Sequence, residues 1–145
     1  MKVILFLALC LYLSYGSEGR KLSKCEFVKI AKSKLNGYAG SSAADWVCLV
    51  QHESNFETTA INHNGKQSTD YGLFQINSKY WCHDGKTARA TNGCGIECSK
   101  LQDDNLEDDI QCAKKIAGQA KGLSPWMGWK SHCKGKNLAS YTSGC

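Results

Sequence analysis

The sequence predicts an α+β fold in which a mostly helical lobe and a small antiparallel β lobe lie on either side of a cleft. Three observations support this prediction. Apolar residues recur at helical spacing in several segments, residues 60–82 carry strand and turn residues instead, and an even number of cysteines follows an apolar leader. Because the strand-like segment lies between the second and third helical segments, we expect it to form a separate lobe.

Residues 1–19 have the features of a signal peptide. Lys2 gives a basic start, residues 3–13 form an apolar run, and Ser17 and Gly19 favour cleavage after Gly19, with cleavage after Gly16 as the alternative. A membrane anchor is the other interpretation, but the run is shorter than the roughly 20 residues that a span needs. We therefore predict a secreted, extracellular protein without stable membrane insertion, whose residues 20–145 form one domain, expected to be monomeric.

Cysteine number and charge narrow the class of protein further. Cleavage after Gly19 removes Cys10 and leaves eight cysteines, an even number that predicts four disulfides in an oxidising compartment. Spacing alone does not choose among the possible pairings. The net charge is +5, which fits both attraction to anionic bacterial surfaces and ordinary solubility. Only two arginines and no clustered basic run are present, so we expect no nucleic-acid partner.

The spacing of apolar residues predicts the first two helices. The first covers about residues 24–35 and ends at Asn36 and Gly37, which tolerate the left-handed cap conformation. The second begins after Ser42, with Asp45 three residues on as a variant capping box. Its core-facing stripe consists of Trp46, Leu49, Val50 and Glu53.

The remaining elements follow in chain order. Residues 60–62 and 69–76 predict a hairpin or a three-stranded sheet around a turn at Asn64-Gly65. A third helix is expected over about residues 106–118. A fourth, short helix is expected to open at Ser124-Pro125, with serine as N-cap and proline in the first turn.

Two acidic residues stand out against these elements. Glu53 occupies a core-facing position in the second helix, whereas Asp70 lies in a polar strand. One carboxyl in an apolar setting and another in a hydrogen-bonded one have separated pKa values, which allows a general acid and an ionised partner at one pH. The pair therefore favours glycoside hydrolysis. Taken singly, Glu53 could be a buried acid paired with a lysine, and Asp70 an ordinary turn residue.

Around these residues the chain resembles the c-type lysozyme and α-lactalbumin family, including its calcium-binding branch. The similarity covers essentially all of residues 20–145, and the eight remaining cysteines have the family's spacing. The matching motifs are Asp45-Trp46-Val47-Cys48, Glu53-Ser54-Asn55-Phe56, Ser68-Thr69-Asp70-Tyr71-Gly72, Gln75-Ile76-Asn77-Ser78, Trp81-Cys82, Cys112-Ala113-Lys114-Lys115 and residues 126–129.

The resemblance implies disulfides, catalytic roles and substrate contacts. Glu53 would be the general acid, kept protonated in an apolar pocket walled by Trp126, and Asp70 the nucleophile or the stabiliser of the oxocarbenium-like transition state. Tyr80 stands where many relatives carry tryptophan, and Gln119 where some carry aspartate. The implied disulfides are Cys25–Cys145, Cys48–Cys133, Cys82–Cys98 and Cys94–Cys112, and the implied substrate contacts are Asn55, Asn64, Gln75, Asn77, Tyr80, Trp81 and Trp126.

The acidic segment 100–110 predicts one structural Ca²⁺ site. Its clustered carboxylates repel one another unless a cation or solvent offsets them, and calcium prefers carboxylate and carbonyl oxygens. The resemblance implies side-chain ligands from Asp103, Asp108 and Asp109 and backbone ligands from Lys100 and Asn105. Capping of the third helix is the alternative, and it accounts for Asp108 and Asp109 but not for Asp103.

Three functions are compatible with these features. The resemblance favours a bacteriolytic, antimicrobial enzyme that cleaves the β-1,4 bond between N-acetylmuramic acid and N-acetylglucosamine in peptidoglycan with retention. The alternative is a non-catalytic calcium-binding regulator of the α-lactalbumin type, a branch that does not keep the acid pair intact. The third is membrane disruption by a basic protein. Because Glu53 and Asp70 are both present, we expect the enzyme.

Overall fold

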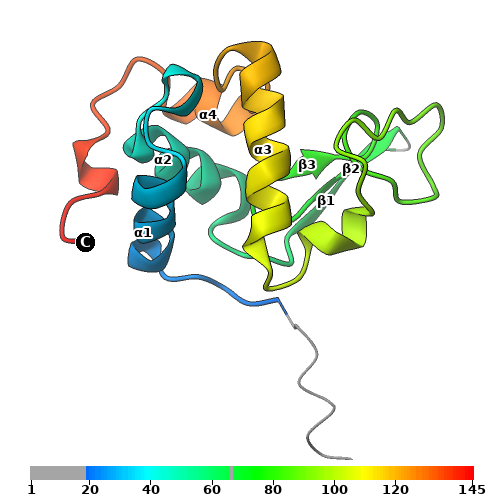
Figure 1. The fold of residues 1–145 in the computed structure, drawn as a ribbon, viewed down its shortest axis with the longest axis horizontal. Helices are drawn as coiled ribbons and strands as arrows, with labels where there is room; N and C mark the ends of the chain where they lie inside the picture. The colour runs from blue at the N-terminus through cyan, green and yellow to red at the C-terminus, as the bar shows by residue number, and fades with distance from the viewer. Residues whose placement is uncertain (1–18, 66) are drawn as a thin grey trace, which may run out of the picture.

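The computed structural model describes residues 19–65 and 67–145, so all of the predicted signal peptide except Gly19 lies outside the described residues. Four helices and a three-stranded antiparallel sheet make up the described fold, as Figure 1 shows. Short 3-10 helices η1, η2 and η3 cover Tyr38–Gly40, Cys98–Leu101 and Ala139–Tyr141. The main elements are α1 (Lys24–Lys34), α2 (Ala43–Ser54), β1 (Ile61–Asn64), β2 (Ser68–Tyr71), β3 (Ile76–Asn77), α3 (Leu106–Ala120) and α4 (Met127–His132).

The two lobes predicted from the sequence are confirmed. In Figure 1, α1, α2 and α4 gather on one side, the sheet lies on the other, and α3 stands between them. The strand order is β1-β2-β3, and Asp70 pairs with Asn62 on one side and Asn77 on the other. This register places Asp70 in the central strand, with amide side chains on both neighbouring strands.

The start of α2 is set by its own sequence. Ser42 Oγ accepts the backbone N–H of Asp45 at 3.2 Å, and Asp45 Oδ2 accepts the backbone N–H of Ser42 at 2.9 Å. This is the predicted capping box, which satisfies two backbone donors at the helix end. A second capping box, between Ser23 and Glu26, starts α1 and was not among the sequence predictions.

The hydrophobic core packs against the buried face of α2. Trp46 is completely buried and meets Phe74 and Trp126 edge-on, with ring centroids 6.0 and 5.8 Å apart. Such tilted aromatic pairs are favoured over face-to-face stacking. Because Leu49 and Val50 are also fully buried, the predicted apolar stripe faces the core and its next member, Glu53, is carried to the core's edge.

The fourth helix begins later than predicted. α4 starts at Met127 with Trp126 as its N-cap, rather than at Ser124-Pro125. The backbone N–H of Trp126 donates to Leu123 O at 3.0 Å and closes a turn, and its indole N–H donates to Phe74 O at 2.7 Å. The tertiary bond to Phe74 fixes Trp126 outside the helix, so the local serine–proline signal does not decide the boundary.

All four expected disulfides are present. Cys25–Cys145 joins the ends of the domain, and Cys48–Cys133 joins α2 to the end of α4. Cys82–Cys98 and Cys94–Cys112 fasten the long loop after β3, the second of them to α3. Each cross-link restricts the unfolded chain, which typically stabilises a fold by about 3 kcal/mol.

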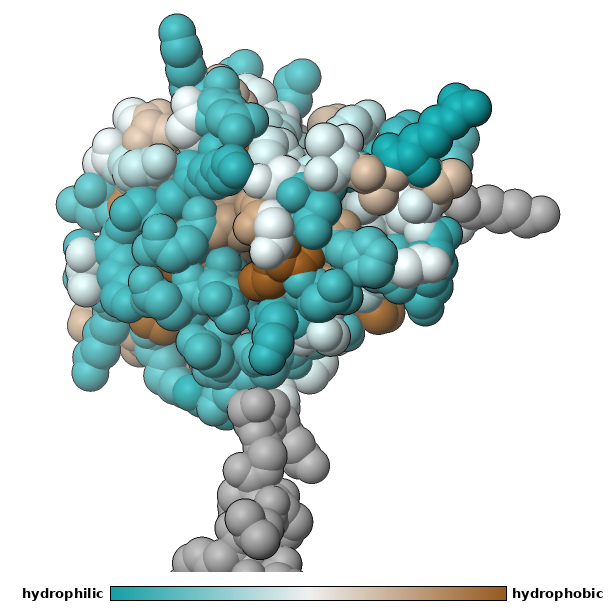
Figure 2. Space-filling view, turned by 45° about the vertical axis from the view of Figure 1, so that its right-hand side comes forward, coloured by the Kyte–Doolittle hydropathy of each residue, from teal (hydrophilic) through white to brown (hydrophobic). Residues whose placement is uncertain are grey.

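The surface of the described residues is predominantly polar. On the face shown in Figure 2, hydrophilic residues dominate and apolar colour is confined to small patches. Within residues 19–65 and 67–145, no helix has the length and apolar character that crossing a membrane requires.

Candidate active site

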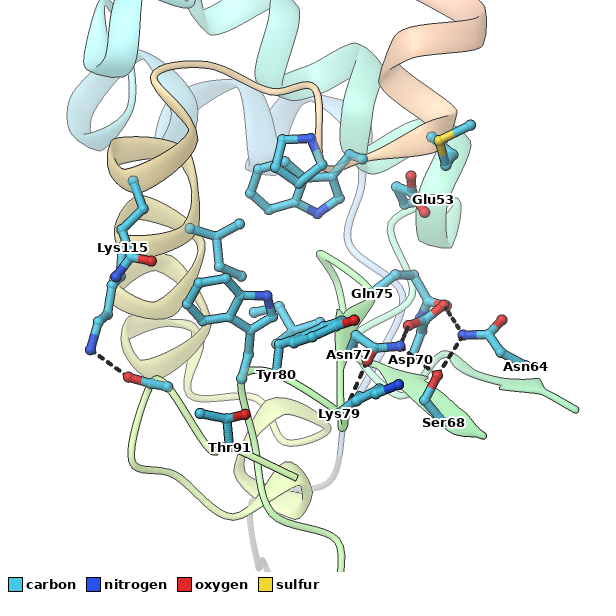
Figure 3. Close-up of a pocket in the computed structure, with 18 of the residues that line it drawn as sticks. Glu53, Asn64, Ser68, Asp70, Gln75, Asn77, Lys79, Tyr80, Thr91 and Lys115 are labelled. Atoms are coloured by element: carbon cyan, nitrogen blue, oxygen red, sulfur yellow. Dashed lines mark hydrogen bonds between the residues drawn. The ribbon is translucent and has the colours of Figure 1, made fainter. Parts of the chain in front are cut away.

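A cleft of about 980 Å³ lies between the two lobes. Glu53 from α2 lies on its helical side and Asp70 from β2 on its sheet side, and α3 contributes a third wall (Figure 3). The cavity thus brings together the two acidic residues that the sequence singled out, 17 positions apart in the chain.

Glu53 sits in the last turn of α2, where it is half-buried. Its Oε1 accepts the backbone N–H of Gly128 at 2.8 Å. Burial raises the pKa of Glu53, because the charged carboxylate loses hydration. The hydrogen bond from Gly128 lowers that pKa in part, and the negative charge of Asp70 raises it again. The net effect favours a carboxyl group that keeps its proton to higher pH than an ordinary glutamate.

Asp70 has a different environment. Its Oδ1 accepts the amide N–H of Asn77 and its Oδ2 that of Asn64, each at 2.9 Å. Asn77 also donates to Ser68 Oγ at 2.8 Å. Figure 3 shows this hydrogen-bonded group across the cleft from Glu53. The two amides orient both carboxylate oxygens of Asp70. Hydrogen-bond donors therefore dominate the environment of Asp70, whereas burial dominates the environment of Glu53.

This pair of environments supports acid and nucleophile chemistry in one site. A carboxyl with a raised pKa can give a proton to a leaving group, while a second, oriented carboxylate can attack or stabilise positive charge. The cavity leaves space for a substrate between them. The arrangement therefore suits cleavage of an acetal such as a glycosidic bond.

The cleft gathers most of the predicted substrate contacts. Asn64, Gln75, Asn77, Tyr80, Trp81 and Trp126 all line it. Asn55 does not line the cavity; it is exposed at the C-terminal end of α2, where its φ of 50° places it in the left-handed region. A role for Asn55 in binding remains a prediction that its position does not support.

Several of these side chains already have protein partners. The Gln75 amide donates to Ala60 O at 3.2 Å and to Gly72 O at 3.0 Å, and its Oε1 accepts from Asn62 at 2.7 Å. Gln75 therefore braces the turn between β2 and β3. Trp126, only 5% exposed, lines the cleft, and its indole N–H is occupied by the hydrogen bond to Phe74 O. Tyr80 is 54% exposed and remains free to contact a ligand.

Two residues of the cleft wall, one on α3 and one on α4, were not predicted from the sequence. Lys115 and Met127 line the cleft, although nothing in their local sequence distinguishes them from ordinary surface and core residues. Lys115 Nζ donates to the carbonyl oxygen of Gly93 and so ties α3 to the loop after β3 (Figure 3). That loop supports Trp81, whose ring lies so close to Gly93 that a side chain there would meet it at 2.8 Å.

The acidic segment contains a second unusual carboxyl. Asp109, in the first turn of α3, is completely buried, and neither of its carboxylate oxygens has a hydrogen-bond partner among the described residues. Burial raises the pKa of Asp109 to about 9, and the negative charges of Asp103 and Asp108 add to that rise. A buried, unpartnered carboxyl is costly and is usually accompanied by a cation or a proton.

The other members of the predicted calcium set are arranged more loosely. Asp103 Oδ1 accepts the backbone N–H of Asn105 at 3.0 Å, and the Asn105 side chain caps α3 by accepting from Glu107 N at 3.2 Å. Throughout residues 19–65 and 67–145, no three histidine, cysteine, aspartate or glutamate side chains converge on one point as metal ligands do. Helix capping thus explains part of this segment, but not the buried oxygens of Asp109.

Sequence similarity to known proteins extends over the whole chain. A sequence model of the C-type lysozyme/alpha-lactalbumin family matches residues 20–145. Lysozyme C-3 of Sus scrofa is 51% identical and lysozyme C-2 of Mus musculus is 50% identical. Lysozyme C of Trichosurus vulpecula is 48% identical. Each alignment covers 100% of this chain and 99% of the relative.

Proposed function

Because the chain belongs to the C-type lysozyme/alpha-lactalbumin family, we propose that its cleft hydrolyses the β-1,4 bond between N-acetylmuramic acid and N-acetylglucosamine in bacterial peptidoglycan. Full-length relatives named lysozyme C, at 50–51% identity, show an enzyme of the lysozyme type. The observation that carries the specific proposal is the half-buried Glu53 across the cleft from the amide-held Asp70. A regulator without hydrolytic activity has no need of that pair.

The first step of the proposed reaction breaks the glycosidic bond. Glu53 gives its proton to the leaving glycosidic oxygen while Asp70 attacks the anomeric carbon from the opposite face and forms a glycosyl ester. This division of roles between two carboxyl groups is the one known for lysozymes in general. Asn64 and Asn77 aim the Asp70 oxygens, and the burial of Glu53 keeps the proton available.

The second step releases the product. The Glu53 carboxylate takes a proton from water, the hydroxide attacks the anomeric carbon, and the ester bond to Asp70 breaks. The new hydroxyl has the configuration of the original bond, which defines a retaining enzyme. Both carboxyl groups return to their starting states.

The same proposal includes location and partner. The apolar leader supports secretion, and the four disulfides suit an oxidising compartment. The natural partner is then the peptidoglycan of bacterial walls, and its hydrolysis makes the protein bacteriolytic. The net charge of +5 supports attraction to the anionic envelope.

We also infer that the acidic segment binds one structural Ca²⁺. Supporting this is Asp109, whose two buried oxygens have no hydrogen-bond partner within residues 19–65 and 67–145. The negative charges of Asp103 and Asp108 add to the rise in its pKa. Carboxylate and carbonyl oxygens are the donors that calcium prefers. Asp103, Asp108 and Asp109 would supply side-chain oxygens, and Lys100 and Asn105 backbone oxygens. The ion would offset the repulsion among the carboxylates and hold the loop against α3.

The hydrolase proposal is tested by lysis of Gram-positive cell walls. The protein spanning residues 20–145 is expected to lyse them, and Glu53→Gln to lose activity by about 100-fold or more because it has no proton to donate. Glu57→Gln is the matched control, since Glu57 is exposed and outside the cleft. Equal lysis by parent and Glu53→Gln would indicate membrane disruption, and no lysis by either would indicate a regulatory protein. NMR of the first-formed anomer tests retention.

A further inference from the structure

Met127 occupies an unusual position for an apolar side chain. It is the first residue of α4 and lines the cleft together with Glu53 and Trp126, yet it is 66% exposed. It is also the sole methionine of residues 20–145, because the only other methionine of the chain is Met1. Since the side chain contributes little to the core, dissolved reagents can reach it in the folded protein.

The peptide unit that follows Met127 contacts the catalytic acid. The N–H of that peptide belongs to Gly128 and donates to Glu53 Oε1 at 2.8 Å. The Met127 side chain therefore projects from the backbone segment that positions Glu53. Burial of its carboxyl group is the principal cause of the raised pKa of Glu53, and the hydrogen bond from Gly128 partly opposes it.

The thioether is the most readily oxidised group in this region. Its sulfur is soft and polarisable, and mild peroxide converts methionine to the sulfoxide. The eight cysteines of residues 20–145 are all in disulfides, and Trp126 is 5% exposed and packed against Trp46. An oxidant that enters the cleft therefore meets an accessible Met127.

We propose that Met127 is a redox-modification site at which hydroperoxides reversibly inhibit the enzyme. This inference rests on the proposed hydrolase function. A sulfur lone pair attacks the distal oxygen of the peroxide, the O–O bond breaks, and an S–O bond forms. Sulfur loses two electrons and the peroxide gains them. The departing oxygen takes the proton of the transferred hydroxyl and leaves as water from hydrogen peroxide or as an alcohol from an organic hydroperoxide.

The product changes the wall beside Glu53. A sulfoxide is polar, hydrated and a strong hydrogen-bond acceptor, whereas the thioether is apolar. Its oxygen competes with the glycosidic oxygen for the proton of Glu53, and its hydration opposes contact with the apolar face of a sugar. The fold stays intact because the side chain is exposed. Inhibition is therefore expected without loss of stability.

To test this, the protein of residues 20–145 is treated with hydrogen peroxide. Its hydrolysis of a soluble β-1,4-linked N-acetylglucosamine oligomer is then measured. Mass spectrometry of the peptide carrying Met127 measures the gain of one oxygen. We expect kcat/KM to fall by about threefold or more, and methionine sulfoxide reductase to restore it. Met127→Leu, compared with its own untreated activity, is expected to resist peroxide.

Two results would overturn the inference. One is a complete sulfoxide at Met127 with unchanged kcat/KM. The other is an equal loss in peroxide-treated Met127→Leu, which would place the sensitive group elsewhere. Inactive untreated protein would overturn the hydrolase proposal instead. Oligosaccharide affinity, measured by tryptophan fluorescence before and after peroxide, then decides the inference by itself, since weakened binding supports it and unchanged binding contradicts it.

Discussion

Gly128 and Glu53, 75 residues apart in sequence, are joined by a 2.8 Å hydrogen bond from the backbone N–H of Gly128 to Oε1 of Glu53. A side-chain carbon at position 128 would lie 2.8 Å from that oxygen, so α4 approaches the acid as closely as a glycine allows. The Cys48–Cys133 disulfide ties the same two helices together. The environment of the acid is consequently a property of the α2–α4 contact.

The first prediction concerns the proton on Glu53. Burial and the charge of Asp70 both raise the pKa of Glu53, so Asp70→Asn should lower that pKa while burial keeps it above the ordinary glutamate value. Carboxyl-carbon NMR titration of both proteins measures this directly. In the parent enzyme, activity should decline as pH rises through the raised pKa, because the general acid then loses its proton. An unchanged pKa in Asp70→Asn would contradict the proposed interaction across the cleft.

A second prediction concerns Asp109 and calcium. Without calcium, a pKa of about 9 means that the folded carboxyl is protonated where the unfolded one is ionised. Its contribution to stability is then greatest at low pH and is lost as pH rises from about 4 to 9. Asp109→Asn removes this loss, so the variant should be the more stable protein at pH 7 in a chelator.

Calcium should stabilise the parent more than it stabilises Asp109→Asn. A ligand at 100 times its dissociation constant stabilises a folded protein by about 2.7 kcal/mol, and only the parent keeps the full ligand set. Thermal unfolding of both proteins in chelator and in calcium measures the effect. If calcium leaves the parent's melting temperature unchanged, the acidic segment is a capped helix end and not a calcium site.

A third prediction concerns acid stability of the β lobe. Burial tends to raise the pKa of Asp84, but hydrogen bonds from the Lys86 backbone and the hydroxyls of Tyr71, Thr87 and Ser78 outweigh it and lower the pKa to about 2. The resulting stabilisation is complete above the unfolded value near 4 and is lost as pH falls toward 2.

Asp84→Asn should therefore be less stable than the parent at pH 6, by about 2 kcal/mol, and lose less stability than the parent between pH 4 and 2. Urea unfolding at several pH values measures both effects. Asp104→Asn serves as the control, because Asp104 forms an exposed ion pair with Arg20 that should contribute little to stability. The same acid response in Asp84→Asn and parent would show that this network does not determine it.

A fourth prediction concerns the turn between β2 and β3. Gly72 has a φ of 78°, and an added Cβ would lie 1.8 Å from the carbonyl oxygen of Leu101. Gly72→Ala should therefore destabilise the protein by about 3 kcal/mol or more, since backbone strain and a clash act together. Gly135 is the matched control, because it has a φ of 72° and no atom of the described residues lies within 4 Å of its Cβ position. Gly135→Ala should cost about 1 kcal/mol. Similar losses of stability in the two variants would indicate that backbone strain alone, without the clash at Leu101, destabilises Gly72→Ala.

The sequence was most informative where structure depends on near neighbours. The capping box of Ser42 and Asp45 uses groups three residues apart, and the stripe from Trp46 to Glu53 follows helical periodicity. Both features are determined within one helix, so both predictions are confirmed. The predicted start of α4 was wrong, because a hydrogen bond between Trp126 and Phe74, 52 residues apart, overrides the local Ser124-Pro125 signal.

The sequence by itself determined which residues have the chemistry for this site: two carboxyls in unlike surroundings, amides on neighbouring strands, and a cluster of acids before α3. Tertiary structure alone decided how these groups are used. It placed Asn55 outside the cleft and Lys115 and Met127 in its walls, and it buried the Asp109 oxygens with no hydrogen-bond partner among the described residues. The physical reason is that periodicity and capping act over a few residues, whereas burial, pKa and cavity shape depend on segments that only folding brings together.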